Sequence, residues 1–305
     1  MKSRLLIVSL LALSTPAFQG SPSRTQLDDL KSRVEAISRS INARWGIYVK
    51  SIETGEEIAI NADESMDTMS TIKIPLMVEA YRQAAEGKFK LTDMHTLKKS
   101  EVQPGTGILQ RWTEGTVMSL KDIIDLMIIV SDNTATDIIY RKVGGPSAVN
   151  RLMDEYRFDR IRATGLAEDW FRALRASNNR DAFHREAKNP FGLSSPRQMG
   201  LLLEKIEKGE AVSKEASEQM LGHLRGQLYA SRIPRYLAFT GFSSRPPHKT
   251  GDFLPYIGND VGVLEANGKR VIVSIFTANH FGNGTILEDA IGRVTELVAS
   301  YFGNR

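Results

Sequence analysis

Ser70 and Lys73 stand three residues apart in the stretch STIK, at the head of the apolar segment IPLMVEAYRQAAEG. The apolar residues of this segment recur at helical spacing, which predicts a helix that ends at Gly87. A serine at a helix N-terminus lies beside the positive end of the helix dipole, and a lysine one turn later accepts its proton if burial lowers the amine pKa. The pair suits a nucleophile. SxxK alone is weak evidence, because about one chance match is expected in a chain of this size, and a capping serine beside a solvated lysine explains it as well.

A second polar group, Ser131-Asp132-Asn133, follows the apolar stretch IIDLMIIV and precedes the helical pattern TATDIIYRKVGG. A loop between two buried helices is suited to holding a hydroxyl and an amide toward a pocket. The alternative is that Asp132 or Asn133 only caps the next helix.

The third group, Lys249-Thr250-Gly251, enters a predicted strand. Lys and Thr there are suited to binding a substrate carboxylate, and glycine lets the substrate approach the backbone. The alternative is a strand edge with an isolated lysine. Each specific tripeptide is expected by chance in fewer than roughly one chain in ten, so the three motifs in this order favour a serine hydrolase site.

With these motifs the chain resembles the class A β-lactamase family of penicillin-recognising serine hydrolases, whose signature is SxxK, SDN and KTG. The segments PGTGILQRW, GLSSPRQMGLLLEKI, SRIPRYL and KTGDFLPYIGNDVGVL also look like family segments, so the resemblance covers nearly the whole chain from about residue 25. It implies a helical domain and an α/β domain, with a five-stranded antiparallel sheet, that enclose the site. It implies no metal and no organic cofactor, and the five histidines have no ligand spacing such as HxxxH.

The resemblance also implies a role for each motif residue. Ser70 is expected to open the β-lactam amide and become acylated, and Lys73 to help take its proton. Ser131 is expected to pass a proton to the leaving nitrogen. Asn133 is expected to hold Lys73 and the side-chain amide of the substrate.

The KTG strand is expected to bind the rest of the substrate. The resemblance places the substrate carboxylate at Lys249 and Thr250, with Gly251 beside the substrate, and the oxyanion hole at the backbone N–H groups of Ser70 and Asp252. Losing one oxyanion donor typically costs about a hundredfold or more. Asp252 departs from the small or neutral residue expected after KTG. Its charge either disfavours anionic substrates or, on an alternating strand, points away from the cleft.

One family feature is missing. Members that hydrolyse β-lactams well have a glutamate, in an ExxxN pattern after the SDN helix, that activates the water for removal of the acyl group. Between Arg160 and Pro196 the chain has no such pattern. Glu168 is the candidate for this role, and the alternative is a surface glutamate in an amphipathic helix AEDWFRALR. Acylation and deacylation are separate steps, so a site without this base is still acylated but turns over slowly.

Three hypotheses of function follow. The first is an exported class A β-lactamase type of hydrolase that opens the β-lactam amide through an acyl-serine, with a role in β-lactam catabolism and antibiotic resistance. The second is a penicillin-binding D-Ala-D-Ala peptidase or an esterase-like acyl-serine hydrolase that deacylates β-lactams slowly. The third is a catalytically silent module that binds cell-wall fragments, against which the intact Ser70 and Lys73 argue.

Helices and strands must bring these motifs together from distant parts of the chain. A first helix is predicted from Thr25, with Asp28 completing a capping-box pattern. WGIYVKSIETGEEIAINAD predicts two antiparallel strands, and HKTGDFL and YIGNDVGVLEANGKRVIVSIFTANH predict further strands with a turn at Ala266-Asn267-Gly268. ILEDAIGRVTELVASYF predicts the last helix.

We therefore expect an α+β fold of two lobes. Residues 21–67 and 226–305 form one lobe, with a five-stranded antiparallel sheet and flanking helices. Residues 68–225 are patterned mostly as helices, with no convincing strand pair, and form an all-helical lobe. The site is expected in the cleft between the two lobes.

The N-terminus MKSRLLIVSLLALSTPAFQG is built like a secretory signal peptide, which we place at residues 1–20. Its apolar run from Leu5 to Leu13 is too short to span a bilayer. We expect a secreted or periplasmic protein with no stable membrane insertion after cleavage. An uncleaved membrane anchor is the alternative.

Composition narrows the partners. The 305 residues carry a formal net charge of +4, from 40 Lys and Arg against 36 Asp and Glu. These charges are spread along the chain, so we expect no nucleic-acid partner. The absence of cysteine excludes disulfides and a thiolate nucleophile. We expect a monomer that acts on a small molecule, either a β-lactam or a cell-wall peptide-like amide.

Overall fold

The structure is a computed structural model that describes residues 24–177, 179–186 and 189–303. The expected signal peptide at residues 1–20 lies outside this range. No helix in the described part of the chain is both long enough and apolar enough to cross a membrane. The α-helices are α1 (Arg24–Ser40), α2 (Lys73–Ala85), α3 (Leu120–Ile129), α4 (Asn133–Val143), α5 (Pro146–Glu155), α6 (Ala167–Ser177), α7 (Arg180–Glu186), α8 (Pro196–Glu207), α9 (Lys214–Arg225) and α10 (Gly284–Gly303).

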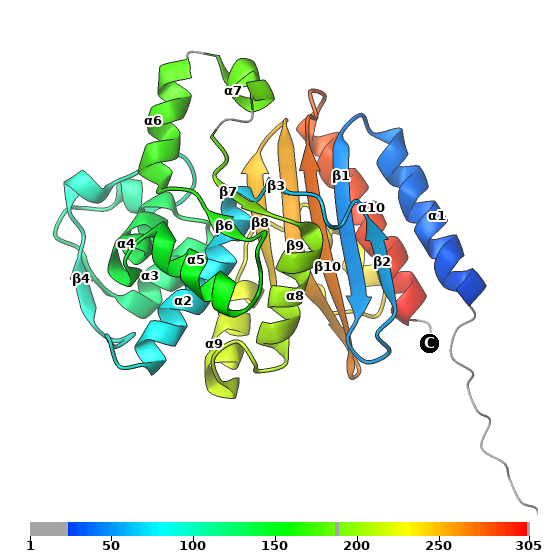
Figure 1. Ribbon diagram of the computed structural model, residues 1–305, viewed down its shortest axis with the longest axis horizontal. Coiled ribbons are helices and arrows are strands. Elements are labelled where there is room, and N and C mark those ends of the chain that lie inside the picture. The colour runs from blue at the N-terminus through cyan, green and yellow to red at the C-terminus, as the bar shows by residue number, and fades with distance from the viewer. Residues whose placement is uncertain (1–23, 178, 187–188, 304–305) are drawn as a thin grey trace, which may run out of the picture.

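An antiparallel sheet of five strands, in the order β2-β1-β10-β9-β8, is the centre of one half of the molecule (Figure 1). Asn267 and Gly268 form the expected turn between β9 and β10, and both have positive φ (46° and 80°), as a tight two-residue hairpin requires. The α+β fold class with a five-stranded antiparallel sheet is therefore confirmed. The strands are β1 (Arg44–Ser51), β2 (Glu57–Ile60), β8 (His248–Phe253), β9 (Ile257–Ala266) and β10 (Lys269–Ala278).

Side chains alternate between the two faces of this sheet, because successive residues of a strand point in opposite directions. Ile47 and Val49 belong to the apolar cluster that joins the sheet to α1 and α10. Tyr48, between them, lies against Gly200 of α8 on the other face. Ile272 and Phe276 of β10 also face α8 and the helical half. The sheet is thus covered on both faces, with α1 and α10 on one side (Figure 1).

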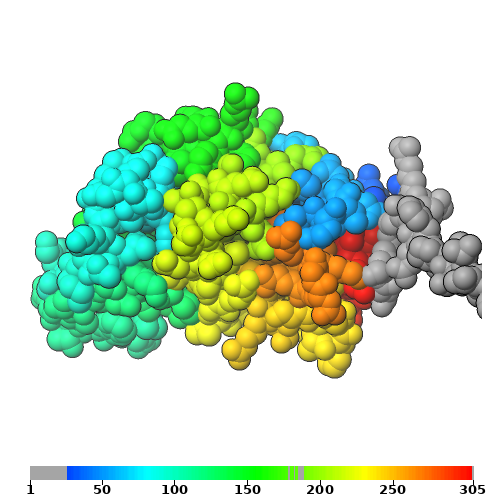
Figure 2. All heavy atoms as spheres, turned by 90° about the horizontal axis from the view of Figure 1, so that it is seen from below, coloured from blue at the N-terminus to red at the C-terminus, as the bar shows by residue number. Residues whose placement is uncertain are grey.

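The SxxK and SDN motifs lie in the helical half, and KTG lies on β8 of the sheet. In the view of Figure 2, the yellow-green segment with α8 and α9 lies between the cyan part of the helical half and the blue and orange strands. Helix α8 lies within the predicted helical lobe, residues 68–225, yet packs on the sheet. The predicted lobe boundaries stay a prediction.

Two details of the sequence prediction are wrong. Helix α1 already includes Arg24, so the helix does not begin at Thr25. Residues 68–225 do contain strand pairs, and these were missed because strands of two or three residues are too short to show an alternating pattern. In one pair β4 (Met94–Thr96) lies beside β5 (Val117–Ser119), and in the other β6 (Arg162–Ala163) lies beside β7 (Gly192–Ser194), which also pairs with β3 (Met66–Asp67).

Candidate active site

Ser70 lies in a short 3₁₀ turn, η1 (Met69–Ile72), directly before α2. It lines a cavity of about 410 Å³. Met69 has a positive φ of 44°, which is unusual for a residue with a side chain, and its N–H donates to Asp67 Oδ1 at 2.8 Å. The Asp67 carboxylate also accepts the N–H of Phe191, so it ties the serine turn to a second wall of the cavity. Among the described residues, no side chain is hydrogen-bonded to Ser70 Oγ.

Lys73, the first residue of α2, is completely buried. Its ammonium donates to Ser131 O at 2.8 Å, to Ser131 Oγ at 3.0 Å and to Asn133 Oδ1 at 3.1 Å. Burial, and then the nearby Lys249 cation, hold the pKa of Lys73 well below its usual value of 10.5. A lysine whose pKa is lowered in this way becomes available as a base near neutral pH.

Ser131 lies between two buried lysines. Its Oγ accepts from Lys73 Nζ at 3.0 Å and from Lys249 Nζ at 3.1 Å, and its φ is positive at 55°. Asp132 caps α4 by accepting the N–H of Ala135, as the structural alternative for this motif predicted. The same carboxylate accepts the N–H groups of Ile108 and Leu109 at 2.7 and 2.8 Å, which fixes the neighbouring loop.

The KTG motif lies on β8 with all three residues buried. Burial lowers the pKa of Lys249 to about 7. Thr250 Oγ1 is buried without a hydrogen-bond partner. A Cβ on Gly251 would lie 2.4 Å from Thr68 O and 3.1 Å from Ser70 N, so glycine allows β8 to approach the serine turn, whereas we expected it to make room for the substrate.

Asp252, the residue after KTG, lines the same cavity as Ser70. Its carboxylate forms an ion pair with Arg232, whose side chain is only 2% exposed and which also contacts Glu288 at 3.0 Å. The charge of Asp252 at the cavity is thus partly offset by a buried guanidinium.

Glu168 lies in the first turn of α6, in the helix that the sequence predicted. Its side chain is 46% exposed, and its carboxylate pairs with Arg141 at 2.9 Å and with Arg172 at 3.4 Å. It is not among the residues that line the Ser70 cavity. Its N–H donates instead to the buried carboxylate of Asp137, whose pKa burial raises to about 6 and which also accepts the N–H of Ala167.

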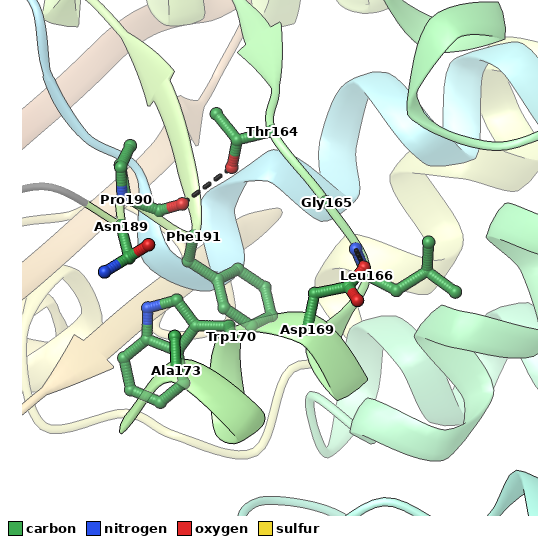
Figure 3. Close-up of a pocket in the computed structure, with 9 residues that line it drawn as sticks. All are labelled: Thr164, Gly165, Leu166, Asp169, Trp170, Ala173, Asn189, Pro190 and Phe191. Atoms are coloured by element: carbon green, nitrogen blue, oxygen red, sulfur yellow. Dashed lines mark hydrogen bonds between the residues drawn. The ribbon is translucent and has the colours of Figure 1, made fainter. Parts of the chain in front are cut away.

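An apolar wall, formed by α6, by Phe191 before β7 and by the end of β8, lines one side of the cavity. A second cavity of about 160 Å³ lies behind this wall, where Thr164 Oγ1 donates to Pro190 O at 2.6 Å (Figure 3). Both cavities are lined by Trp170 and Phe191, which therefore separate them, and Asp169 lines only the second one. The wall facing Ser70 consists of Trp170, Phe171, Leu174, Phe191, Phe253 and Leu254.

Sequence reasoning missed this wall and the cation at its edge, Arg180. The density of aromatic residues in AEDWFRALR was a signal, but helical periodicity does not reveal which cavity an aromatic face lines. In the described part of the chain, no group of three His, Asp or Glu side chains is arranged to hold a metal ion.

Comparisons with known proteins agree with this geometry. Residues 29–302 match the model of a family described as the beta-lactamase enzyme family. The β-lactamase VEB-1 of Pseudomonas aeruginosa is 22% identical over 313 residues, which cover 99% of this chain and 98% of that protein. The crystal structure of a β-lactamase from Sphaerobacter thermophilus is 27% identical, with a TM-score of 0.76, and the match covers 92% of this chain and 97% of that chain. A mutant of PBP-A, in an acyl-enzyme complex with penicillin G, has a similar fold, with a TM-score of 0.77, 23% identity and coverage of 92% and 98%.

Proposed function

Because this chain belongs to the beta-lactamase enzyme family and is a serine β-lactamase-like hydrolase of the class A type, we propose that it opens β-lactam amides through an acyl-serine at Ser70. The observation that carries this proposal is the hydrogen-bonded group of Lys73, Ser131 and Lys249 beside the cavity that Ser70 lines. In this proposal the protein contributes to β-lactam catabolism and antibiotic resistance.

Acylation uses the buried lysines in two different ways. Lys73, with its lowered pKa, takes the proton as Ser70 Oγ attacks the amide carbon. Ser131 Oγ, in contact with Lys73, passes a proton to the leaving nitrogen. Lys249 and the unpartnered hydroxyl of Thr250 bind the substrate carboxylate. The backbone N–H groups of Ser70 and Asp252 receive the oxyanion.

Deacylation requires a base that activates water, and the cavity supplies few candidates. Its only ionisable lining residues in the described chain are Arg180 and Asp252, and Asp252 is paired with Arg232. An aromatic wall stands between the cavity and Asp169. We therefore expect deacylation to be slow, and this is the observation that supports a second candidate function, a penicillin-binding D-Ala-D-Ala peptidase or esterase-like hydrolase.

The cellular context is also part of the proposal. The signal-peptide pattern at residues 1–20 supports export to the periplasm or the medium, where a β-lactam or a cell-wall peptide is met first. We propose a monomer that needs no cofactor, nucleic acid or membrane.

The first experiment is a stopped-flow mix of the purified mature chain with a chromogenic cephalosporin, followed by intact-mass analysis of the same sample. Sustained turnover supports the β-lactamase. A single burst with a lasting mass increase on Ser70, together with cleavage of a D-Ala-D-Ala peptide, supports the second candidate. If the sample shows no turnover and no adduct on Ser70, both candidate functions are overturned.

A further inference from the structure

Arg180, at the start of α7, brings a positive charge to the cavity that Ser70 lines. Its guanidinium carbon lies 4.8 Å from the centroid of the Phe253 ring, and the residue is exposed to solvent. An arginine held over an aromatic face keeps its N–H donors available at the ring edge. Phe253 therefore positions this cation at the mouth of the cavity.

The neighbouring acidic side chains are engaged elsewhere. Glu168 and Asp169 pair with Arg172, and Glu168 also with Arg141. Asp181 accepts a hydrogen bond from Tyr256. In the described parts of the chain, none of these carboxylates forms an ion pair with Arg180. The guanidinium is therefore free to receive an anion from a ligand.

The other charges near the cavity do not cancel this one. Asp252 is the only other ionisable residue in the lining of the described cavity, and its carboxylate is bound to Arg232. Lys73 and Lys249 are buried and turned toward Ser131. The solvent-facing charge on the side of the apolar wall is thus positive.

The substrate side chain is the part that reaches this wall. A Cβ on Gly105 would touch both Phe171 and the Asn133 amide, so Phe171 lies next to the group that we expect to hold the side-chain amide of the substrate. The ring carboxylate is expected at Lys249 and Thr250. What extends from Asn133 along the wall toward Arg180 is the acyl side chain.

We propose that Arg180 is a specificity-determining residue that binds an anionic group on the acyl side chain of the substrate. Preferred substrates then carry a carboxylate beside an aryl or alkyl group: the apolar part packs on the wall and the carboxylate meets the guanidinium. This inference rests on the proposed acylation of Ser70.

The test compares three penicillins that share one ring system and one phenyl group. Benzylpenicillin has no charge on its side chain, carbenicillin has an α-carboxylate, and ampicillin has an α-ammonium. Second-order rate constants for adduct formation on Ser70 are measured by quenched flow and intact mass for wild type, Arg180→Gln, Arg180→Lys and the control Arg175→Gln. Arg175 is exposed on α6 and does not line the cavity.

We expect wild type to react fastest with carbenicillin and slowest with ampicillin. Arg180→Gln should lower the carbenicillin constant about fivefold, as expected for one exposed charge pair, and change the benzylpenicillin constant less than about twofold. Arg180→Lys should retain most of the preference for carbenicillin over benzylpenicillin, and Arg175→Gln should retain this preference in full. Added salt should reduce the preference of wild type.

An unchanged ratio of carbenicillin to benzylpenicillin in Arg180→Gln would overturn the inference while leaving the proposed function intact. An equal loss with all three penicillins would also overturn it, because the residue would then act on the shape of the cavity and not on charge. The absence of any Ser70 adduct in wild type would instead overturn the proposed function, and this inference with it.

Discussion

Glu168 Oε2 accepts a hydrogen bond from Arg141 Nη2 at 2.9 Å, on the exposed side of α6. Two residues later in the same helix, Trp170 lines the cavity that holds Ser70. Residues two apart in an α-helix point in nearly opposite directions, so Glu168 and Trp170 cannot face the same cavity. The glutamate that the sequence suggested for water activation is therefore held on the surface by its ion pair.

Glu168→Gln should leave β-lactam chemistry unchanged. The substitution removes a half-exposed ion pair and no group of the cavity, so we expect acylation and deacylation rates within about twofold of wild type. Stability should fall by at most about 1 kcal/mol. Single-turnover kinetics with intact-mass detection measure both steps. A deacylation rate in the variant far below that of wild type, with an unchanged acylation rate, would assign the water-activating role to Glu168 after all.

Ser70→Ala should abolish covalent labelling by a fluorescent penicillin and leave the thermal unfolding curve unchanged. Ser70 Oγ has no hydrogen bond to another side chain in the described structure, so its removal breaks no structural contact. Ser65→Ala is a matched control, because Ser65 is an exposed serine close in sequence that lies outside the Ser70 cavity. Labelling that persists in Ser70→Ala, or that disappears in Ser65→Ala, contradicts the assignment of the nucleophile.

The sequence predicts the sheet well because its strands are long enough to show their pattern. β9 and β10 each have ten residues and are joined by Asn267 and Gly268, two residues suited to the positive φ of a tight turn. The short strands of the helical half leave no such signal. Strands of two or three residues are set by tertiary packing, and local periodicity does not encode that.

The same distinction holds for the site. SxxK, SDN and KTG are local patterns, and the structure brings Lys73, Ser131 and Lys249 into hydrogen-bonding contact although 58 and 118 residues separate the partners. The wall of Trp170 and Phe191, and the charge of Arg180 over Phe253, depend on how α6 and α7 pack on the sheet. No spacing within the chain reveals these contacts, because they join segments whose separation in sequence follows no rule.

Gly251→Ala should destabilise the protein by about 2 kcal/mol, the middle of the range for an overpacked buried site. The new Cβ would lie 2.4 Å from Thr68 O. This oxygen belongs to the backbone that leads into the Ser70 turn, so a change of side-chain rotamer cannot relieve the clash. Acylation of Ser70 should slow as well. Urea denaturation and penicillin labelling measure the two effects.

Gly222→Ala is the control for this substitution. Gly222 lies in α9, and a Cβ there meets nothing within 4 Å. Alanine in the helix interior should stabilise the protein by up to about 1 kcal/mol. If Gly251→Ala proves as stable and as reactive as Gly222→Ala, then β8 does not pack against the serine turn as closely as the structure has it.

Binding of the substrate carboxylate should weaken as the pH rises above about 7. Burial lowers the pKa of Lys249 to about 7, so its amine is charged below this value and neutral above it, and only the charged form attracts a carboxylate. The dissociation constant of the non-covalent benzylpenicillin complex should therefore rise roughly tenfold between pH 7 and 8.5.

Lys73 acts in the opposite direction on the acylation step, because its neutral form is the base. Saturation stopped-flow kinetics separate the two effects, since one appears in the dissociation constant and the other in the limiting rate. Lys249→Arg keeps its charge throughout this range and should give a dissociation constant that does not vary with pH. A wild-type constant that stays flat, or a Lys249→Arg variant that follows the wild-type curve, would show that Lys249 does not bind the carboxylate through its charge.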